Sequence, residues 1–136
     1  MRFFPYVLLA VILLSCGDDD YPVKLDKNQV TRLLTQNNSK IWTLTSDIEC
    51  EEDNTLTFHK AKDAKSSPEF SLLKGEALCD EESAEEETGT WEVISTPSSN
   101  QLRFLGVETI TYDIVLITAT TLHLRSTETE LKYVAL

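Results

Sequence analysis

The chain has 136 residues, of which 12 are Lys or Arg and 23 are Asp or Glu, for a formal net charge of −11. This length allows one small domain. The isoelectric point near 4.5 argues against nucleic acid or an anionic lipid surface as a partner, because both need a basic patch. Charged residues make up 26% and hydrophobic residues 41% of the chain, an ordinary globular composition that argues against wholesale disorder.

The N-terminal residues have the organisation of a signal peptide. Arg2 precedes a mostly apolar run, residues 3–14, which is too short for a transmembrane helix because a bilayer core needs about 20 apolar residues. The run ends in Leu13-Leu14-Ser15-Cys16, which resembles the bacterial lipobox, in which cleavage leaves an acylated Cys at the new N-terminus. We therefore expect residues 1–15 to be a lipoprotein signal peptide and Cys16 to be lipidated. An ordinary secretory signal with a coincidental Cys is the alternative.

An acidic tether follows the expected lipidation site. Gly17 and the aspartates at positions 18–20 resemble the export signal that sends lipoproteins of the Bacteroidetes to the cell surface. The alternative is that these aspartates only keep residues 16–24 hydrated. Two or three acyl chains hold a protein firmly to a bilayer, so no spanning segment is needed. We expect an outer-membrane lipoprotein, either exported to the cell surface or facing the periplasm.

Cys50 and Cys79 remain once Cys16 is acylated, and we expect them to form a disulfide. They are an even pair in a compartment where thiols oxidise, and the bond would contribute about 3 kcal/mol in the chain-entropy model. A zinc site with His59 as third ligand is the alternative, but zinc needs four ligands at motif spacing. A catalytic thiol is disfavoured because Cys50 lies between Glu49 and Glu51, and acidic neighbours make a poorer nucleophile.

Hydrophobic periodicity predicts one helix followed by strands. Asp26 can cap a helix over residues 26–37, in which Val30, Leu33 and Leu34 follow helical spacing. Beyond this helix, apolar residues alternate with polar and β-branched ones, as in half-buried strands. The alternating positions are Trp42 and Leu44; Leu56 and Phe58; Phe70 and Leu72; Trp91 and Val93; Leu102 and Phe104; Ile110, Tyr112, Ile114 and Leu116; Leu122 and Leu124; and Leu131, Tyr133 and Ala135.

This pattern predicts an all-β fold: a small antiparallel up-and-down barrel of about eight strands with one short N-terminal helix. Turn-forming residues separate most of the runs, and a sheet with mostly short connections hides its edges best by closing. Residues 61–87 are polar and acid-rich, and we expect them to form a long loop around a short strand. Residues 25–136 are thus one domain.

The order of several short motifs along this domain is informative. They are Ser39-Lys40-Ile41-Trp42-Thr43-Leu44, Thr55-Leu56-Thr57-Phe58 after Cys50, Gly89-Thr90-Trp91-Glu92-Val93 after Cys79, Tyr112-Asp113-Ile114, and Thr120-Thr121-Leu122-His123-Leu124. This order resembles the lipocalin-like domains of Bacteroidetes lipoproteins over most of residues 26–136. Trp42 stands where lipocalins have the Trp of a Gly-x-Trp motif, although position 40 is Lys instead of Gly. The resemblance implies a small barrel with a ligand-binding mouth and implies no enzymatic activity.

Large aromatic residues on the expected inner face are the candidate ligand contacts. They are Trp42, Phe58, Trp91, Phe104, Tyr112 and Tyr133. A barrel of about eight strands is either filled by its own side chains or holds one small ligand, and aromatic bulk favours filling.

No enzyme motif of the Gly-x-Ser-x-Gly, Gly-rich phosphate-binding or His-Glu-x-x-His type is present in the sequence. His59 and His123 lie beside inward-facing positions, so we expect both on the solvent face. The acidic clusters at residues 47–53 and 80–87 would lie side by side if the expected disulfide forms, and a weak calcium site is then an alternative to a solvated acidic face. We expect neither an enzyme nor a cofactor.

Two functions from different classes remain. The first is a binding module that captures a small apolar or amphipathic molecule near the membrane. The second is a structural or protein-interaction module of the cell envelope with a filled core. In both cases we expect a monomer that is held to the membrane by its lipid anchor and does not bind nucleic acid.

Overall fold

Eight strands and one short helix make up the part of the chain that the structure describes. The structure is a computed structural model, and it describes residues 24–45, 53–75 and 86–136. Cys16, Cys50 and Cys79 lie outside these residues, as do the expected signal peptide and most of the tether. The elements are α1 (Lys27–Thr35), β1 (Ser39–Thr45), β2 (Thr55–His59), β3 (Glu69–Leu73), β4 (Glu87–Ser95), β5 (Asn100–Leu105), β6 (Thr109–Ile117), β7 (Thr121–Arg125) and β8 (Glu130–Ala135).

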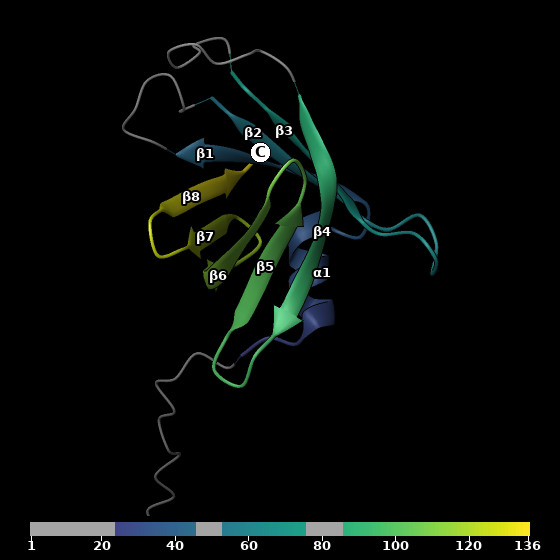
Figure 1. Ribbon diagram of the computed structural model, residues 1–136, viewed down its shortest axis with the longest axis vertical. Helices are drawn as coiled ribbons and strands as arrows, with labels where there is room; N and C mark the ends of the chain where they lie inside the picture. Colours follow the sequence, from purple (N-terminus) through teal and green to yellow (C-terminus); the bar gives the residue numbers. More distant parts are fainter. Residues whose placement is uncertain (1–23, 46–52, 76–85) are drawn as a thin grey trace, which may run out of the picture.

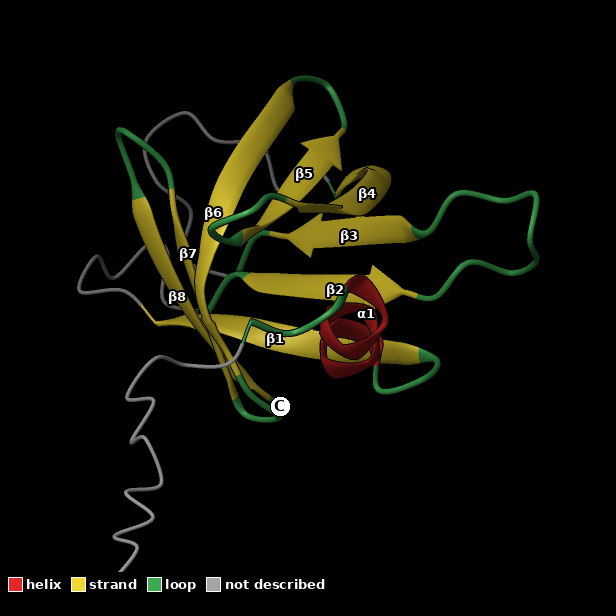
Figure 2. Cartoon of the chain, turned by 90° about the horizontal axis from the view of Figure 1, so that it is seen from below, coloured by secondary structure: helices red, strands yellow, loops and turns green. Residues whose placement is uncertain are grey.

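The strands form a closed barrel in sequence order (Figure 1). Each strand pairs antiparallel with the next one along the chain. β8 also pairs with β1, so that Ala135 lies opposite Trp42 and Tyr133 lies opposite Leu44. Figure 2 shows the barrel from below, with α1 beside β1 and β2. The expected all-β, up-and-down barrel with one short helix is confirmed for the described residues.

The helix α1 begins and ends at residues suited to helix termini. The carboxylate of Asp26 accepts a hydrogen bond from the backbone amide of Gln29, and the Gln29 side chain accepts one from the Asp26 amide, which together form a capping box. The helix ends at Gln36, whose φ of 50° is left-handed, so it is slightly shorter than expected. Within the described ranges, no helix has the length and apolar character that crossing a membrane requires.

Apolar side chains from the helix and the strands meet in one core. Every strand residue in this core is a position at which the alternation predicts an inward side chain. The buried hydrophobic residues are Val30, Leu34, Trp42, Leu44, Leu56, Phe58, Phe70, Trp91, Val93, Leu102, Leu122, Leu124 and Tyr133. The period-two pattern therefore identifies the inner face of most strands correctly.

β6 departs from the expected pattern. The sequence predicts that Leu116 continues an inward series with Ile114, but Leu116 is 48% exposed. The pairing of β6 with β7 shifts register between Ile114 and Leu116, as in a β-bulge. An extra residue at this point reverses which side chains face inward. Ile117, beyond the shift, packs against the core instead, so the prediction for Leu116 is wrong.

The two ends of the barrel differ in what covers them. The end that we call the α1 end carries residues 36–38, 60–68, 96–99 and 118–120, which connect consecutive elements. The opposite end, which we call the far end, carries the remaining connections, two of which include segments outside the described residues. These two connections leave the barrel close together, because the Gly75 amide donates a hydrogen bond to the side-chain oxygen of Asn54 at 3.0 Å.

Candidate functional site

The six aromatic residues expected to contact a ligand fall into two groups. Four are buried in the core: Trp42, Phe58, Trp91 and Tyr133, each 5% exposed or less. Phe104 and Tyr112 are only partly buried, although both pack against the same core. The structure thus places all six on the inner face, but only the last two are accessible in part to a ligand.

A continuous set of ring contacts joins the two groups. The ring of Phe58 lies 5.4 Å from that of Trp91 and 5.8 Å from that of Phe104, measured between centroids. Phe104 in turn contacts Tyr112 at 5.9 Å, edge to face. Such geometries are favourable for aromatic pairs. A molecule that touches Tyr112 or Phe104 is therefore linked through packed rings to Trp91 in the core.

Phe70 is a further member of this cluster that the sequence reasoning did not assign to the site. Its ring lies 5.0 Å from that of Phe104, edge to face. Phe70 pairs in register with Gly89, where an added Cβ would lie 2.8 Å from the Phe70 ring and 2.4 Å from the Leu105 carbonyl oxygen. Gly89 is the feature of the sequence that could have indicated Phe70, because a strand glycine on the inner face leaves space for a large neighbouring side chain.

The far end combines apolar side chains with one inward carboxylate. Glu87 pairs in register with Leu72, which packs against the core, so its side chain lies on the inner face. Ile110 lies on the same face of β6 as Tyr112 and is 40% exposed. An open pocket of about 560 Å³ is lined here by Glu86, Glu87, Thr88, Val107, Glu108 and Ile110.

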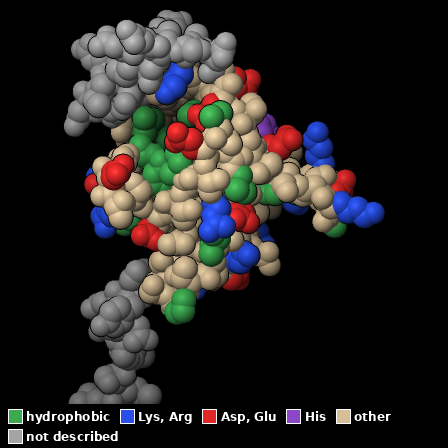
Figure 3. Space-filling view, viewed as in Figure 1, with side chains coloured by type: hydrophobic (Ala, Val, Ile, Leu, Met, Phe, Trp, Pro, Cys, Tyr) green, Lys and Arg blue, Asp and Glu red, His purple; other side chains and the backbone are tan. Residues whose placement is uncertain are grey.

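The surface at this end is visible in Figure 3. Hydrophobic side chains gather there beside acidic ones, just below the grey atoms of the segments that are not described.

The charge of Glu87 also acts on Tyr112. Burial is the main cause that raises the pKa of the Tyr112 hydroxyl, and the Glu87 carboxylate is the second. The hydroxyl therefore stays protonated at neutral pH and is able to donate a hydrogen bond.

The α1 end is closed by Lys40 and Trp42. The Lys40 ammonium donates to the carbonyl oxygens of Leu33 at 3.2 Å and Ala119 at 2.6 Å, and Trp42 Nε1 donates to that of Leu34 at 3.2 Å. The last carbonyls of a helix have no partner within the helix, so these bonds fasten α1 to β1. Lys40 also lies 4.4 Å from the centre of the Trp42 ring, a cation–π contact. Burial lowers the pKa of Lys40.

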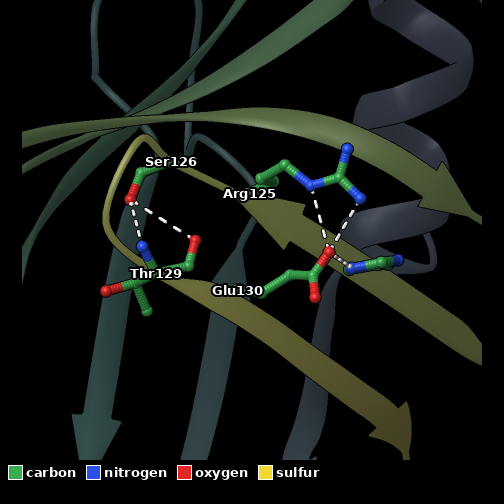
Figure 4. A network of polar contacts seen from close by, with 5 residues as sticks. Arg125, Ser126, Thr129 and Glu130 are labelled. Atoms are coloured by element: carbon green, nitrogen blue, oxygen red, sulfur yellow. Dashed lines mark hydrogen bonds and ion pairs between the residues drawn. The ribbon is translucent and has the colours of Figure 1, made fainter.

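The two histidines lie on the outer face of the barrel, but neighbours partly cover both. The side chain of His123 is 16% exposed, and its Nε2 lies 3.0 Å from Oε1 of Glu130. The same oxygen accepts hydrogen bonds from Arg125 at 2.7 and 3.0 Å (Figure 4). The Arg125 bonds, with a smaller contribution from His123, hold the pKa of Glu130 below its ordinary value. Because these groups bind one another, the cluster stabilises the β7–β8 turn.

The cysteine and metal expectations concern residues outside the described ranges. Cys16, Cys50 and Cys79 are not described, nor is most of the two acidic clusters. Among the residues that are described, no group of three or more His, Cys, Asp or Glu is arranged to hold a metal ion.

Comparisons with known proteins found no match. No protein-family model matches the chain, and neither does any curated protein or solved structure. The class of the protein is therefore defined by the strand order and closure, as an eight-stranded antiparallel barrel with one capped helix.

Proposed function

We propose that the protein is a membrane-anchored extracytoplasmic lipoprotein whose lipocalin-like barrel binds a small amphipathic molecule at its far end. The observation that carries the proposal is the partial exposure of Phe104 and Tyr112 at that end, in a barrel whose other described core aromatics are buried. Ligand sites in proteins are concave and mostly apolar, with a few polar groups that fix orientation.

The polar groups at the far end favour an amphipathic ligand over a purely apolar one. The Glu87 carboxylate is able to accept hydrogen bonds from a ligand, and the protonated hydroxyl of Tyr112 is able to donate one. Ile110 and Phe104 offer apolar contact. An apolar molecule without a polar group would leave the Glu87 carboxylate partly desolvated without a partner, which is costly. A ligand with a hydroxyl, amide or amine beside an apolar body meets both requirements.

Binding of the neutral fluorescent probe N-phenylnaphthylamine tests the far end as a ligand site. Ile110→Ala removes apolar contact at this end and is expected to weaken probe binding about threefold to tenfold. Ile41→Ala is the matched control, because Ile41 has similar exposure (44% against 40%) but lies on the outer face of β1. The measurement is the change in probe fluorescence on titration. Equal weakening by both substitutions, or no saturable binding to the parent chain, would contradict the proposal.

A filled barrel that acts through protein contacts is the second candidate. It is supported by the complete burial of Trp42, Phe58 and Trp91, which leaves the α1 end of the interior occupied by side chains. Failure of the probe to bind favours this candidate.

The anchor part of the proposal rests on Cys16 and the apolar run before it. Metabolic labelling with palmitate is expected to mark the parent chain and to leave a Cys16→Ala variant unlabelled. Recovery of the parent chain in the soluble fraction without label would remove the anchor but leave the binding proposal standing.

The proposed disulfide between Cys50 and Cys79 is supported by the hydrogen bond from Gly75 to Asn54, because it holds the two connections that carry the cysteines together at the far end. Titration of the unreduced, denatured protein is expected to find neither thiol free. Two free thiols in addition to any at Cys16 would exclude the bond.

A further inference from the structure

A second cavity lies at the α1 end, on the opposite side of the fold from the proposed ligand site. It has a volume of about 340 Å³ and lies between the start of β1, the end of β2 and the loop that leads to β3. Figure 2 shows this loop projecting from the barrel. The lining residues are Asn38, Ser39, His59, Lys60, Lys62, Ser66, Ser67 and Glu69.

The lining is rich in hydrogen-bond donors and has no hydrophobic side chain. Two lysines, one histidine, three serines and one asparagine face a single carboxylate, that of Glu69. Lysine ammonium groups and hydroxyls are suited to the several acceptor oxygens of an oxyanion.

Three of these donor side chains have no partner within the described part of the chain. The side chains of Lys60, Lys62 and Ser67 make no hydrogen bond or ion pair with any described residue. The backbone positions them instead: the amide of Lys60 donates to the carbonyl oxygen of Asn38 at 2.7 Å, which joins the end of β2 to the segment after α1.

Asp63, the aspartate of this loop, makes its hydrogen bonds within its own turn. One oxygen of Asp63 accepts hydrogen bonds from the amides of Lys65 and Ser66, each at 2.8 Å, and from the Ser66 hydroxyl at 2.9 Å. These bonds hold the pKa of Asp63 below its ordinary value and keep its carboxylate in its own turn.

The loop is locally basic. Residues 60–66 include three lysines and only this one acidic residue, although the whole chain has a net charge of −11. Figure 3 shows basic side chains gathered on the projecting loop.

We propose that this cavity binds a phosphate-type oxyanion, with Lys60 and Lys62 supplying charge and Ser67 and Asn38 supplying neutral donors. Lysine binds phosphate as a point charge. Glu69 disfavours negative charge on its own side of the cavity and selects for a ligand that presents a hydroxyl there. Free phosphate, a phosphorylated polyol and the headgroup of an anionic phospholipid share this chemistry. The inference does not depend on ligand binding at the far end.

Titration of the full chain with inorganic phosphate, at constant ionic strength and in a non-ionic detergent, tests the proposal. Amide chemical shifts are expected to change saturably at millimolar phosphate and to be largest at the cavity-lining residues. The double substitution Lys60→Gln, Lys62→Gln is expected to weaken binding about tenfold, because it removes both cations.

The matched control is Lys27→Gln, Lys65→Gln. It removes the same charge from an exposed helix position and from the same loop, but neither residue lines the cavity. Binding to this control is expected to stay within about twofold of the parent value, since neither lysine lines the cavity and charges that act through solvent are screened by salt. Equal weakening in the two double variants would overturn the proposal, because it would show attraction by net charge alone.

Two further binding measurements distinguish a soluble phosphate from a lipid headgroup. One uses glycerol phosphate, and the other uses phosphatidylcholine vesicles with and without phosphatidylglycerol. Binding to phosphatidylglycerol vesicles that depends on Lys60 and Lys62, with weak binding of soluble phosphates, identifies a lipid headgroup. Tighter binding of glycerol phosphate than of inorganic phosphate identifies a soluble phosphorylated polyol. Binding to none of these probes would overturn the proposal.

Discussion

The α1 end and the far end of the barrel both place aromatic and charged residues on the inner face, but the burial and the hydrogen bonding of these residues differ. At the α1 end, Trp42 is fully buried, and its indole nitrogen and the Lys40 ammonium both donate to carbonyl oxygens. At the far end, Phe104 and Tyr112 remain partly exposed, and the inward Glu87 places a charge beside them. The α1 end therefore buries Trp42 completely and pairs Lys40 with carbonyl oxygens, while the far end leaves aromatic and polar groups of the inner face accessible. Within the core, side chains are therefore packed and paired at the α1 end, whereas at the far end some of them stay accessible to a ligand.

The largest expected effect tests whether stability resides at the α1 end. Trp42→Ala removes a fully buried side chain and is expected to lower the free energy of unfolding by about 3–5 kcal/mol. Tyr112→Ala removes a partly buried ring at the far end and is expected to cost about 1–2 kcal/mol. Urea unfolding of both variants measures the difference. Equal losses would show that the two ends do not differ in this respect.

A smaller effect is expected from the contacts that fasten α1 to β1. Lys40→Met keeps an unbranched side chain of similar length but leaves the carbonyl oxygens of Leu33 and Ala119 without their donor. The expected loss is about 1–3 kcal/mol of unfolding free energy. Lys132→Met, at an exposed position of β8, is the control and is expected to change stability by less than about 0.5 kcal/mol. A loss in the control as large as that for Lys40 would contradict the role given to these bonds.

The smallest expected effect is a change in titration at the far end. Glu87→Gln removes the charge that helps to raise the pKa of Tyr112, so this pKa should fall toward the ordinary tyrosine value while burial keeps it above that value. Phenolate absorbance measures the change, and a Tyr112→Phe variant identifies which part of the signal belongs to Tyr112. An unchanged titration curve would mean that the two groups do not interact, and Glu87 would then have no part in the proposed site.

Most of the fold follows from local patterns in the sequence. The capping pair Asp26 and Gln29 marks the start of α1, and the period-two runs mark the inner face of the strands. The main error is Leu116, because a bulge depends on how β6 pairs with β7 and leaves no mark in the alternation of one strand. The end of the helix also differs from the expectation, because the left-handed backbone at Gln36 terminates the helix before the asparagines at positions 37 and 38.

The candidate sites were less predictable than the fold. The sequence identifies six aromatics on the inner face but cannot distinguish the buried Trp91 from the partly exposed Tyr112, since both alternate in the same way. The sequence places Glu87 in an acidic loop, although it is the first residue of β4 and its pairing with Leu72 turns its side chain inward. From the sequence, Lys40 is only a departure from a Gly-x-Trp motif. Its contacts with the helix and with Ala119 depend on segments far apart in the sequence.

The pairing of β8 with β1 affects how the protein folds and how incomplete chains aggregate. The Thr45 hydroxyl donates to the carbonyl oxygen of Lys132, a contact between residues 87 positions apart. Contacts over such separations form slowly because a long stretch of chain must first be ordered. A ribosome that stalled, or a protease that cut, before Glu130 would leave β1 and β7 with unsatisfied edges. Such a fragment would be prone to join other chains into aggregates.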